Sequence, residues 1–296
     1  MIWTAYQVSF RLLSPMHVGW RKLGNLQQTR PYLTGRNLWG ALTARLTRES
    51  GSSDYVGIGK QVDDQLAFTY FYPYALPGED SIWSWPDQWS DFAWPWSDWD
   101  KFAWTFLGSY ASTALANGRN AEAGSLHETE FIAPRTREGK QVYLVGYIFE
   151  TVGLQNDQTN SLSKWQSVLE RIQLGGERGY GWGRVHLQGR CEQINNGKCF
   201  GYKLLPNNGR PRLKACGNTH LLAHTYAETD SVSNREVTVE PLVGRETKGH
   251  TNFGKELSQA AVCWVPGGKV AQGETFQIQP KGVWEQHTQV LQSVLY

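Results

Sequence analysis

The alternation of apolar and polar residues from Trp3 to Leu13 predicts a half-buried strand, which Ser14-Pro15 brings to an end. Further along the chain, Leu38, Leu42 and Leu46 recur every four residues, as on the buried face of an amphipathic helix. We expect this helix over residues 36–48, with Thr34 as its N-cap. The chain therefore begins with a strand, a long connection and a helix.

The pattern up to residue 190 adds further strands and a second helix. Apolar residues at 162, 165, 169 and 172 predict an amphipathic helix over residues 161–172. Strands are expected at residues 68–74, 126–132, 141–150 and 184–189, and loops at residues 21–30, 51–59, 117–124 and 133–140. This order of elements predicts an α+β fold, in which a ferredoxin-like (βαββαβ) unit carries a long insertion after its first helix.

The last third of the chain has strand candidates at residues 221–226, 236–242, 260–265 and 275–279. We therefore divide the protein into a ferredoxin-like domain at residues 1–190 and a second, strand-rich half at residues 191–296, which we expect to be of the same kind. The insertion in the first domain covers about residues 78–124.

The insertion is unusually rich in tryptophan. Residues 83–104 hold seven of the chain's fourteen tryptophans, together with four aspartates and no arginine. Tryptophan can stack on nucleobases, but the aspartates would repel a phosphate backbone. The segment either packs on this protein or docks a protein neighbour, and the enrichment of Trp at protein interfaces favours the neighbour.

Charge is distributed unevenly, although the net charge is only +2. Residues 1–60 hold eight Lys/Arg against two acidic residues, whereas residues 61–100 hold eight Asp/Glu and no Lys or Arg. A basic segment followed by an acidic one indicates two surfaces with different partners.

Composition is that of a globular protein, and the sequence lacks the usual signals of a membrane protein, a secreted protein or a metalloprotein. No apolar run approaches a bilayer span, and the first residues do not read as a signal peptide, so we expect a cytoplasmic protein without membrane contact. The four cysteines form no Cys-x-x-Cys pair, and we expect neither a metal nor a cofactor. The spacing of Cys216, His220 and His224 is a weak exception, since one helix face would bring the three together.

The most distinctive stretch is Gln173-Leu-Gly-Gly-Glu-Arg-Gly-Tyr-Gly-Trp-Gly-Arg-Val185, in which five glycines fall within nine residues. Such a loop can bring bare backbone amides close to a ligand, with guanidinium groups and aromatic faces on either side. Phosphates and unstacked bases both suit that surface. The spacing excludes the P-loop and the dinucleotide-binding fingerprint. A glycine-rich hairpin turn without a ligand is the structural alternative.

Three local motifs resemble the RAMP superfamily of CRISPR effector subunits. Leu13-Ser-Pro-Met-His-Val-Gly19 is similar to the end of that family's first strand, and Tyr32-Leu-Thr-Gly-Arg-Asn-Leu-Trp-Gly-Ala-Leu42 is similar to the start of its first helix. Leu174-Gly-Gly-Glu-Arg-Gly-Tyr-Gly-Trp-Gly-Arg-Val185 is similar to its glycine-rich loop. The resemblance does not cover the Trp-rich insertion, and Thr34 stands where the family usually has proline.

The resemblance implies an RRM-like fold that holds a guide RNA (crRNA) through the glycine loop and the region of the first helix. The long second half looks like the single-copy (Cas-five-like) subunit that caps the 5′ repeat-derived tag of the guide in type III complexes, with the type III-D version as the preferred comparison. Its partners would be the large polymerase/cyclase-like subunit and the backbone RAMP subunits, with target RNA met only indirectly. The RNA-binding residues expected are His17, Arg21, Lys22, Arg30, Arg36, Asn37, Gly175, Gly176, Arg178, Gly179, Tyr180, Gly181, Trp182, Gly183, Arg184, Arg245 and Lys248.

Other functions remain open at this point. A (Cas-seven-like) backbone subunit that cuts target RNA carries an Asp in the loop between first strand and helix, but residues 20–31 hold no acidic residue here. A repeat-processing endonuclease would need a general base and acid, for which His17, His127 and Lys140 are the candidates without any spacing that links them. His17 is also readily explained as a structural histidine beside Trp20. A scaffold organised around the Trp-rich segment is the third alternative.

Overall fold

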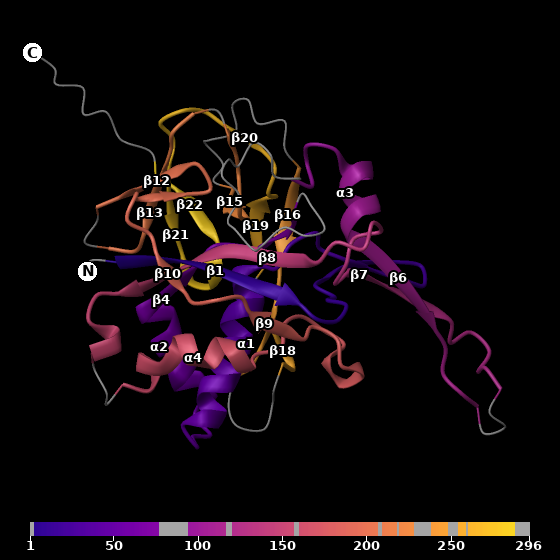
Figure 1. The fold of residues 1–296 in the computed structure, drawn as a ribbon. Helices are drawn as coiled ribbons and strands as arrows, with labels where there is room; N and C mark the ends of the chain where they lie inside the picture. The colour runs from indigo at the N-terminus through magenta and orange to yellow at the C-terminus, as the bar shows by residue number, and fades with distance from the viewer. Residues whose placement is uncertain are drawn as a thin grey trace, which may run out of the picture.

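The computed structural model describes residues 3–76, 94–116, 120–156, 160–206, 209–217, 219–227, 238–247, 254–258 and 260–287. Its central sheet is antiparallel and pairs β1 with β8 over nine residue pairs, from Trp3↔Thr151 to Arg11↔Tyr143. On the other side of β1 lie β9 and β10, and on the other side of β8 lie β4 and β5. β1 and β8 run side by side across the middle of the molecule in Figure 1. The bounds are β1 Trp3–Leu12, β4 Leu66–Phe68, β5 Tyr72–Ala75, β8 Val142–Thr151, β9 Val185–Leu187 and β10 Glu192–Gln193.

This strand order is that of a ferredoxin-like fold. If β4 and β5 count as one edge strand and β9 and β10 as the other, the strands in chain order are β1, β4/β5, β8 and β9/β10, and in the sheet they lie in the order fourth, first, third, second. A helical segment follows the first strand and another precedes the last, which completes the βαββαβ unit. The predicted α+β, ferredoxin-like fold is therefore confirmed.

The helices cover one face of this sheet. α1 (Gly35–Glu49) begins where expected, because the Thr34 side chain accepts a hydrogen bond from the backbone N–H of Asn37. Its Leu38, Leu42 and Leu46 pack in one core with apolar residues of β1 and β8, which are Val8, Phe10, Leu12, Val142, Leu144 and Ile148. The segment expected as a second helix is an irregular run of short turns around α4 (Trp165–Val168), but its apolar residues 162, 165, 169 and 172 are all buried as predicted.

The opposite face of the central sheet packs against the second half of the chain. That half forms an eight-stranded sheet in the order β11-β12-β13-β21-β22-β15-β19-β16, in which only β15 and β22 are parallel. Odd-numbered residues of β8, among them Val145 and Phe149, share a second core with Tyr202, Phe276 and Trp284. The bounds are β11 Lys198–Cys199, β12 Tyr202–Leu205, β13 Arg212–Ala215, β15 Thr225–Tyr226, β16 Val239–Leu242, β19 Ala261–Trp264, β21 Thr275–Ile278 and β22 Trp284–Gln286.

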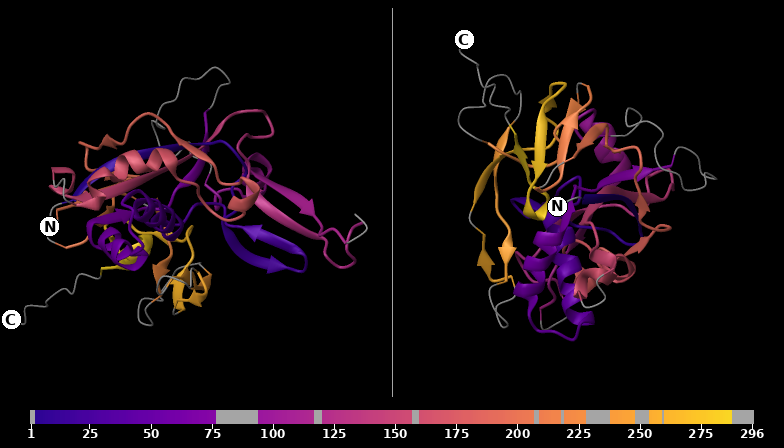
Figure 2. Two further views of the ribbon diagram at one scale, coloured as in Figure 1. Left: turned by 90° about the horizontal axis from the view of Figure 1, so that it is seen from below. Right: turned by 90° about the vertical axis from the view of Figure 1, so that its left-hand side faces the viewer.

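Two short two-stranded pairs complete the second half: β14 Thr219–His220 with β20 Lys269–Val270, and β17 Arg245–Glu246 with β18 Glu256–Leu257. Among the residues described after 190 there is no α-helix, so this half does not repeat the βαββαβ order of the first. The division of the chain into domains at residue 190 stays a prediction. The two halves share a core, and the strands of the second half lie beside the central sheet in the right-hand view of Figure 2.

A third sheet projects from the body. It has the order β2-β3-β7-β6 and consists of two hairpins joined where β3 and β7 pair in parallel, at Leu26↔Glu128 and Gln27↔Thr129. Both hairpins extend from the same side of the molecule, in indigo and magenta in the left-hand view of Figure 2. The bounds are β2 Gly19–Leu23, β3 Leu26–Thr29, β6 Leu107–Ser112 and β7 His127–Ile132. The basic loop predicted at residues 21–30 is therefore wrong, since most of it forms this hairpin.

Two other local predictions differ from the structure. Residues 51–59 were expected to form a loop, but α2 (Tyr55–Gln65) begins within them, with Asp54 as its N-cap. The aromatic strand expected at residues 68–74 is interrupted between β4 and β5. Strands β7, β8 and β9 lie where they were predicted.

Half of the Trp-rich segment, residues 83–93, lies outside the described residues. Of the part that is described, Trp94 and Trp96 stack on each other and pack edge-on against Tyr72, so they belong to the second core. α3 (Trp99–Phe106) follows and leads into β6. In the part of the chain that the structure describes, no helix is both long enough and apolar enough to span a bilayer.

Candidate nucleic-acid interface

The glycine loop is held against the turn that follows β1. The backbone N–H of Gly183 donates to the carbonyl of Pro15 (2.7 Å), and that of Gly176 donates to the carbonyl of His17 (2.7 Å). The N–H of Arg184 donates to the Ser14 hydroxyl (2.9 Å). Two of the three sequence motifs, far apart in the chain, thus meet at one surface.

Two of the glycines are required by this docking. Gly175 has φ 79° and Gly183 has φ 74°, both in the left-handed region that favours glycine. A Cβ on Gly175 would collide with the carbonyl of His17, and one on Gly183 would collide with the carbonyl of Leu174. By contrast, a Cβ on Gly179 or Gly181 would meet no heavy atom within 4 Å among the described residues. Gly175 and Gly183 therefore fix the loop, whereas Gly179 and Gly181 leave open space beside their backbone.

The loop presents a cationic and aromatic surface. Arg178 and Arg184 are exposed, and Tyr180 is 85% exposed. The ring of Trp182 lies edge-on to Phe131 of β7, with the centroids 5.2 Å apart, and to Tyr110 of β6 at 6.5 Å. Trp182 therefore anchors the loop to the projecting sheet, while Tyr180 stays accessible to a ligand.

Arg21 and Lys22 lie on the projecting hairpin of β2 and β3 and are exposed. The guanidinium of Arg21 lies 4.1 Å from the ring centroid of Trp20, and its Nε donates to Gln28 (2.7 Å). These two cations remain available to an anionic ligand, on a different element from the glycine loop.

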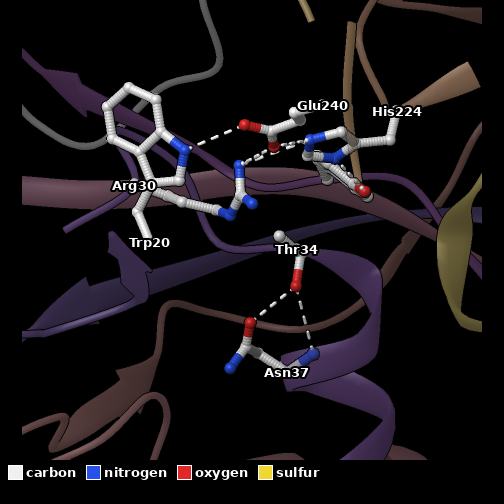
Figure 3. Close-up of polar contacts among 7 residues, drawn as sticks. Trp20, Arg30, Thr34, Asn37, His224 and Glu240 are labelled. Atoms are coloured by element: carbon white, nitrogen blue, oxygen red, sulfur yellow. Dashed lines mark hydrogen bonds and ion pairs between the residues drawn. The ribbon is translucent and has the colours of Figure 1, made fainter. Parts of the chain in front are cut away.

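Arg30 has a different setting, because it is buried against the second half of the chain. Its Nη1 lies 2.6 Å from Oε1 of Glu240, and the same carboxylate accepts from His224 Nε2 (2.6 Å) and from Trp20 Nε1 (2.9 Å), as Figure 3 shows. Nδ1 of His224 accepts from the Tyr70 hydroxyl (2.8 Å). The structure thus places Arg30 in an internal ion pair and not at a surface that RNA could reach.

The electrostatics of this cluster keep Glu240 ionised. Burial acts to raise the pKa of Glu240, but the hydrogen bond from His224 and the charge of Arg30 outweigh it and hold the pKa at about 2. For His224 burial dominates and lowers the pKa, so its ring is neutral at neutral pH. The arrangement is a neutral histidine between a phenol and a carboxylate that Arg30 balances.

The start of α1 is also engaged internally. Asn37 is occupied in the cap of the helix, where its Oδ1 accepts from the Thr34 hydroxyl (2.6 Å; Figure 3). Arg36 Nη1 lies 3.3 Å from Glu246, which also pairs with Lys281 (3.2 Å). Arg245 is exposed and donates to the carbonyl of Gly254 (3.2 Å), and Lys248 lies outside the described residues. The helix start therefore faces the second half of the chain.

His17 supports the loop from within. Its ring is buried, and Nδ1 donates to the Glu130 carbonyl (2.7 Å). The His17 carbonyl accepts the hydrogen bond from the backbone N–H of Gly176. This is the setting of a structural histidine. The metal site considered at Cys216, His220 and His224 is not formed. Both ring nitrogens of His224 are engaged with Tyr70 and Glu240, and Cys216 is exposed. Among the described residues, no group of three or more His, Cys, Asp or Glu could hold a metal ion.

Residues 110 and 131 belong to this surface but do not stand out in the sequence. Tyr110 is 60% exposed and flanks Trp182 on the projecting sheet. The sequence predicts strand β7, which carries Phe131. It does not predict the pairing of β6 with β7 that brings Tyr110 to the loop.

No family model matches the sequence, and no curated protein matches it. Solved structures do resemble the fold. One is a chain of a type III-B Cmr-beta complex bound to cognate target RNA and AMPPnP, at 11% identity and TM-score 0.49, over 90% of this chain and 86% of that chain. Another comes from type III-B Cmr-beta bound to cognate target RNA, at 11% identity and TM-score 0.41, over 62% of this chain and 96% of that chain. A third comes from the apo state of Cmr-beta, at 10% identity and TM-score 0.36, over 65% of this chain and 98% of that chain. All three scores lie below 0.5, so the fold assignment rests on the strand order.

Proposed function

We propose that this protein is a non-catalytic RNA-binding subunit of a type III CRISPR effector complex, which holds the 5′ repeat-derived tag of the guide RNA. One observation carries the proposal. The glycine loop docks on the Ser14–His17 turn, so that two motifs of the RAMP resemblance form one surface with exposed Arg178, Tyr180 and Arg184. Cations for the phosphates, an accessible ring for a base and open backbone at Gly179 and Gly181 are what a single strand of RNA requires.

The nuclease alternatives gain no support from the side chains that would have to act. The ring of His17 is buried, and the ring of His127 accepts from the Ser112 hydroxyl (2.8 Å) while donating to the Ser125 carbonyl (3.0 Å). The amine of Lys140 pairs with Glu138 (2.9 Å). These three groups lie on different elements, and the proposal assigns none of them a catalytic role.

The proposal is tested by RNA binding to variants of the loop. Arg178→Gln with Arg184→Gln removes two cations from the loop, while Lys203→Gln with Lys214→Gln removes two exposed cations that face each other across β12 and β13. The probe is a fluorescein-labelled RNA with the 5′ tag of the host's guide RNAs, and the readout is anisotropy over a range of salt concentrations.

We expect the loop variant to bind more weakly, and its slope of log affinity against log salt to fall by about 1.4, at about 0.7 for each phosphate contact on a single strand. The control should keep the wild-type slope. Equal binding by wild type and loop variant would overturn the proposed role of the loop and favour the scaffold alternative.

A further inference from the structure

A cleft of about 840 Å³ lies between the C-terminal half of α1, the turn after it and the residues that lead into the glycine loop. Arg45 and Arg48 line it from the helix, Tyr55 from the start of α2, and Arg171, Arg178 and Gly179 from the loop side. Its volume falls within the range of about 300–1,000 Å³ that is usual for ligand sites. Four arginines at one cleft indicate an anionic ligand.

Two of the arginines are already engaged. Arg171 forms a bidentate pair with Glu49, through Nε to Oε1 (2.7 Å) and Nη2 to Oε2 (2.9 Å), and Arg45 Nε reaches the same Oε1 (2.6 Å). The hydrogen bond from Arg171 is the main reason that the pKa of Glu49 is lowered to about 2, so this carboxylate stays ionised. Glu49 thus neutralises two of the four arginines that line the cleft.

The other two, Arg48 and Arg178, are exposed, and no side chain among the described residues pairs with either in an ion pair. Arg178 belongs both to the glycine loop and to the cleft, and Gly179 beside it has open space above its backbone. An RNA strand that crosses the loop therefore reaches the cleft at Arg178, a cation that the two share. This continuity favours a polynucleotide over a free nucleotide.

We propose that the cleft binds phosphates of the same RNA strand where it leaves the glycine loop, with Arg48 and Arg178 as the contacts and Glu49 as a carboxylate that weakens them. The inference rests on the proposed function and extends its binding site onto the helical side of the molecule. It assigns a role to Arg48 and Glu49, which belong to none of the motifs in the sequence.

The test uses two variants of opposite expected effect. Glu49→Gln removes the carboxylate and releases Arg45 and Arg171, so single-stranded oligouridylate should bind more tightly and with a steeper salt dependence. Arg48→Gln should bind more weakly and lose about 0.7 from the slope. Lys203→Gln removes the same charge as Arg48→Gln from the remote strand β12 and should leave the slope unchanged.

A third variant, Tyr180→Ala with Arg184→Gln, separates the cleft from the loop. If it weakens binding while Glu49→Gln and Arg48→Gln both behave as wild type, the cleft proposal is overturned and the proposed function stands. If wild type binds no RNA, both fall. Glu49→Gln also removes the ion pair between α1 and Arg171, so the fold of this variant is checked by thermal melting. If it unfolds, Arg48→Gln still decides the test, because Arg48 is exposed and its replacement should not affect folding.

Discussion

Replacing Glu240 by glutamine should destabilise the protein far more than the loss of one carboxylate at a surface. Glu240 is the single acidic partner of Arg30 in the described structure, and their side chains are only 18% and 10% exposed. Gln keeps the shape of the side chain but removes its charge, which leaves the Arg30 guanidinium buried and unbalanced. Breaking a buried pair in this way costs about 3–5 kcal/mol.

Because Glu240 retains some exposure, we expect the lower end, about 3 kcal/mol, or a fall in Tm of about 6–12 °C for a chain of this size. Glu246→Gln is the matched control. Glu246 also joins the two halves, through Arg36 at 3.3 Å, and it pairs with Lys281 of its own half at 3.2 Å. These side chains are more exposed, so the loss of Glu246 should cost less than about 1 kcal/mol.

The assay is chemical denaturation of both variants, followed across pH. The pKa of Glu240 is about 2 in the folded protein against an ordinary 4.5, so its stabilisation is present above about pH 4.5 and is lost as the pH falls towards 2. The difference between wild type and Glu240→Gln should shrink over this window. Arg30→Met combined with Glu240→Gln should recover part of the loss, because the unbalanced charge is gone. If Glu240→Gln cost no more than Glu246→Gln, the reasoning would be refuted.

Three further predictions concern the loop and one half-buried acid, Asp63. Tyr180→Ala should change stability by less than about 0.5 kcal/mol, because the ring is 85% exposed, yet weaken RNA binding by about 1–3 kcal/mol; a change in melting without a change in affinity would contradict this. Gly183→Ala should lower both Tm and RNA affinity, since its Cβ meets the Leu174 carbonyl at a positive φ, whereas Gly179→Ala should leave Tm close to wild type. Burial raises the pKa of Asp63 to about 6 from 3.8, so its protonated form stabilises the fold at low pH and this contribution is lost as the pH rises through 6. Asp63→Asn should therefore be more stable than wild type at pH 8, by up to about 3 kcal/mol, and a denaturation series that shows no gain would rule this out.

Local patterns predicted the central unit of the fold well. The alternation in β1 and the four-residue spacing in α1 report burial on one face, and the Thr34 cap needs only the residues beside it. The hairpin of β2 and β3 was missed because β2 is largely exposed and neither strand shows an alternation of burial. In addition, β3 is stabilised by pairing with β7, about a hundred residues away. Long-range pairing leaves no local signal.

The candidate site was likewise predicted in its local part but not in its long-range contacts. The glycine loop was found from its sequence alone, because the density of glycine and arginine is itself the feature. Arg30 and Arg36 were expected at the RNA surface, but Glu240 and Glu246 in the second half of the chain pair with them instead. A single sequence shows which cations are present and not which of them a distant carboxylate will neutralise.

The most direct test of the account is to purify the protein with its complex from the native host and sequence the RNA that copurifies. We expect short RNAs that share one repeat-derived 5′ end with wild type, and a strong depletion of these RNAs with Arg178→Gln and Arg184→Gln. An intact complex that carries no RNA above background, or the same RNA whatever the state of the loop, would contradict the claim that this subunit holds the guide.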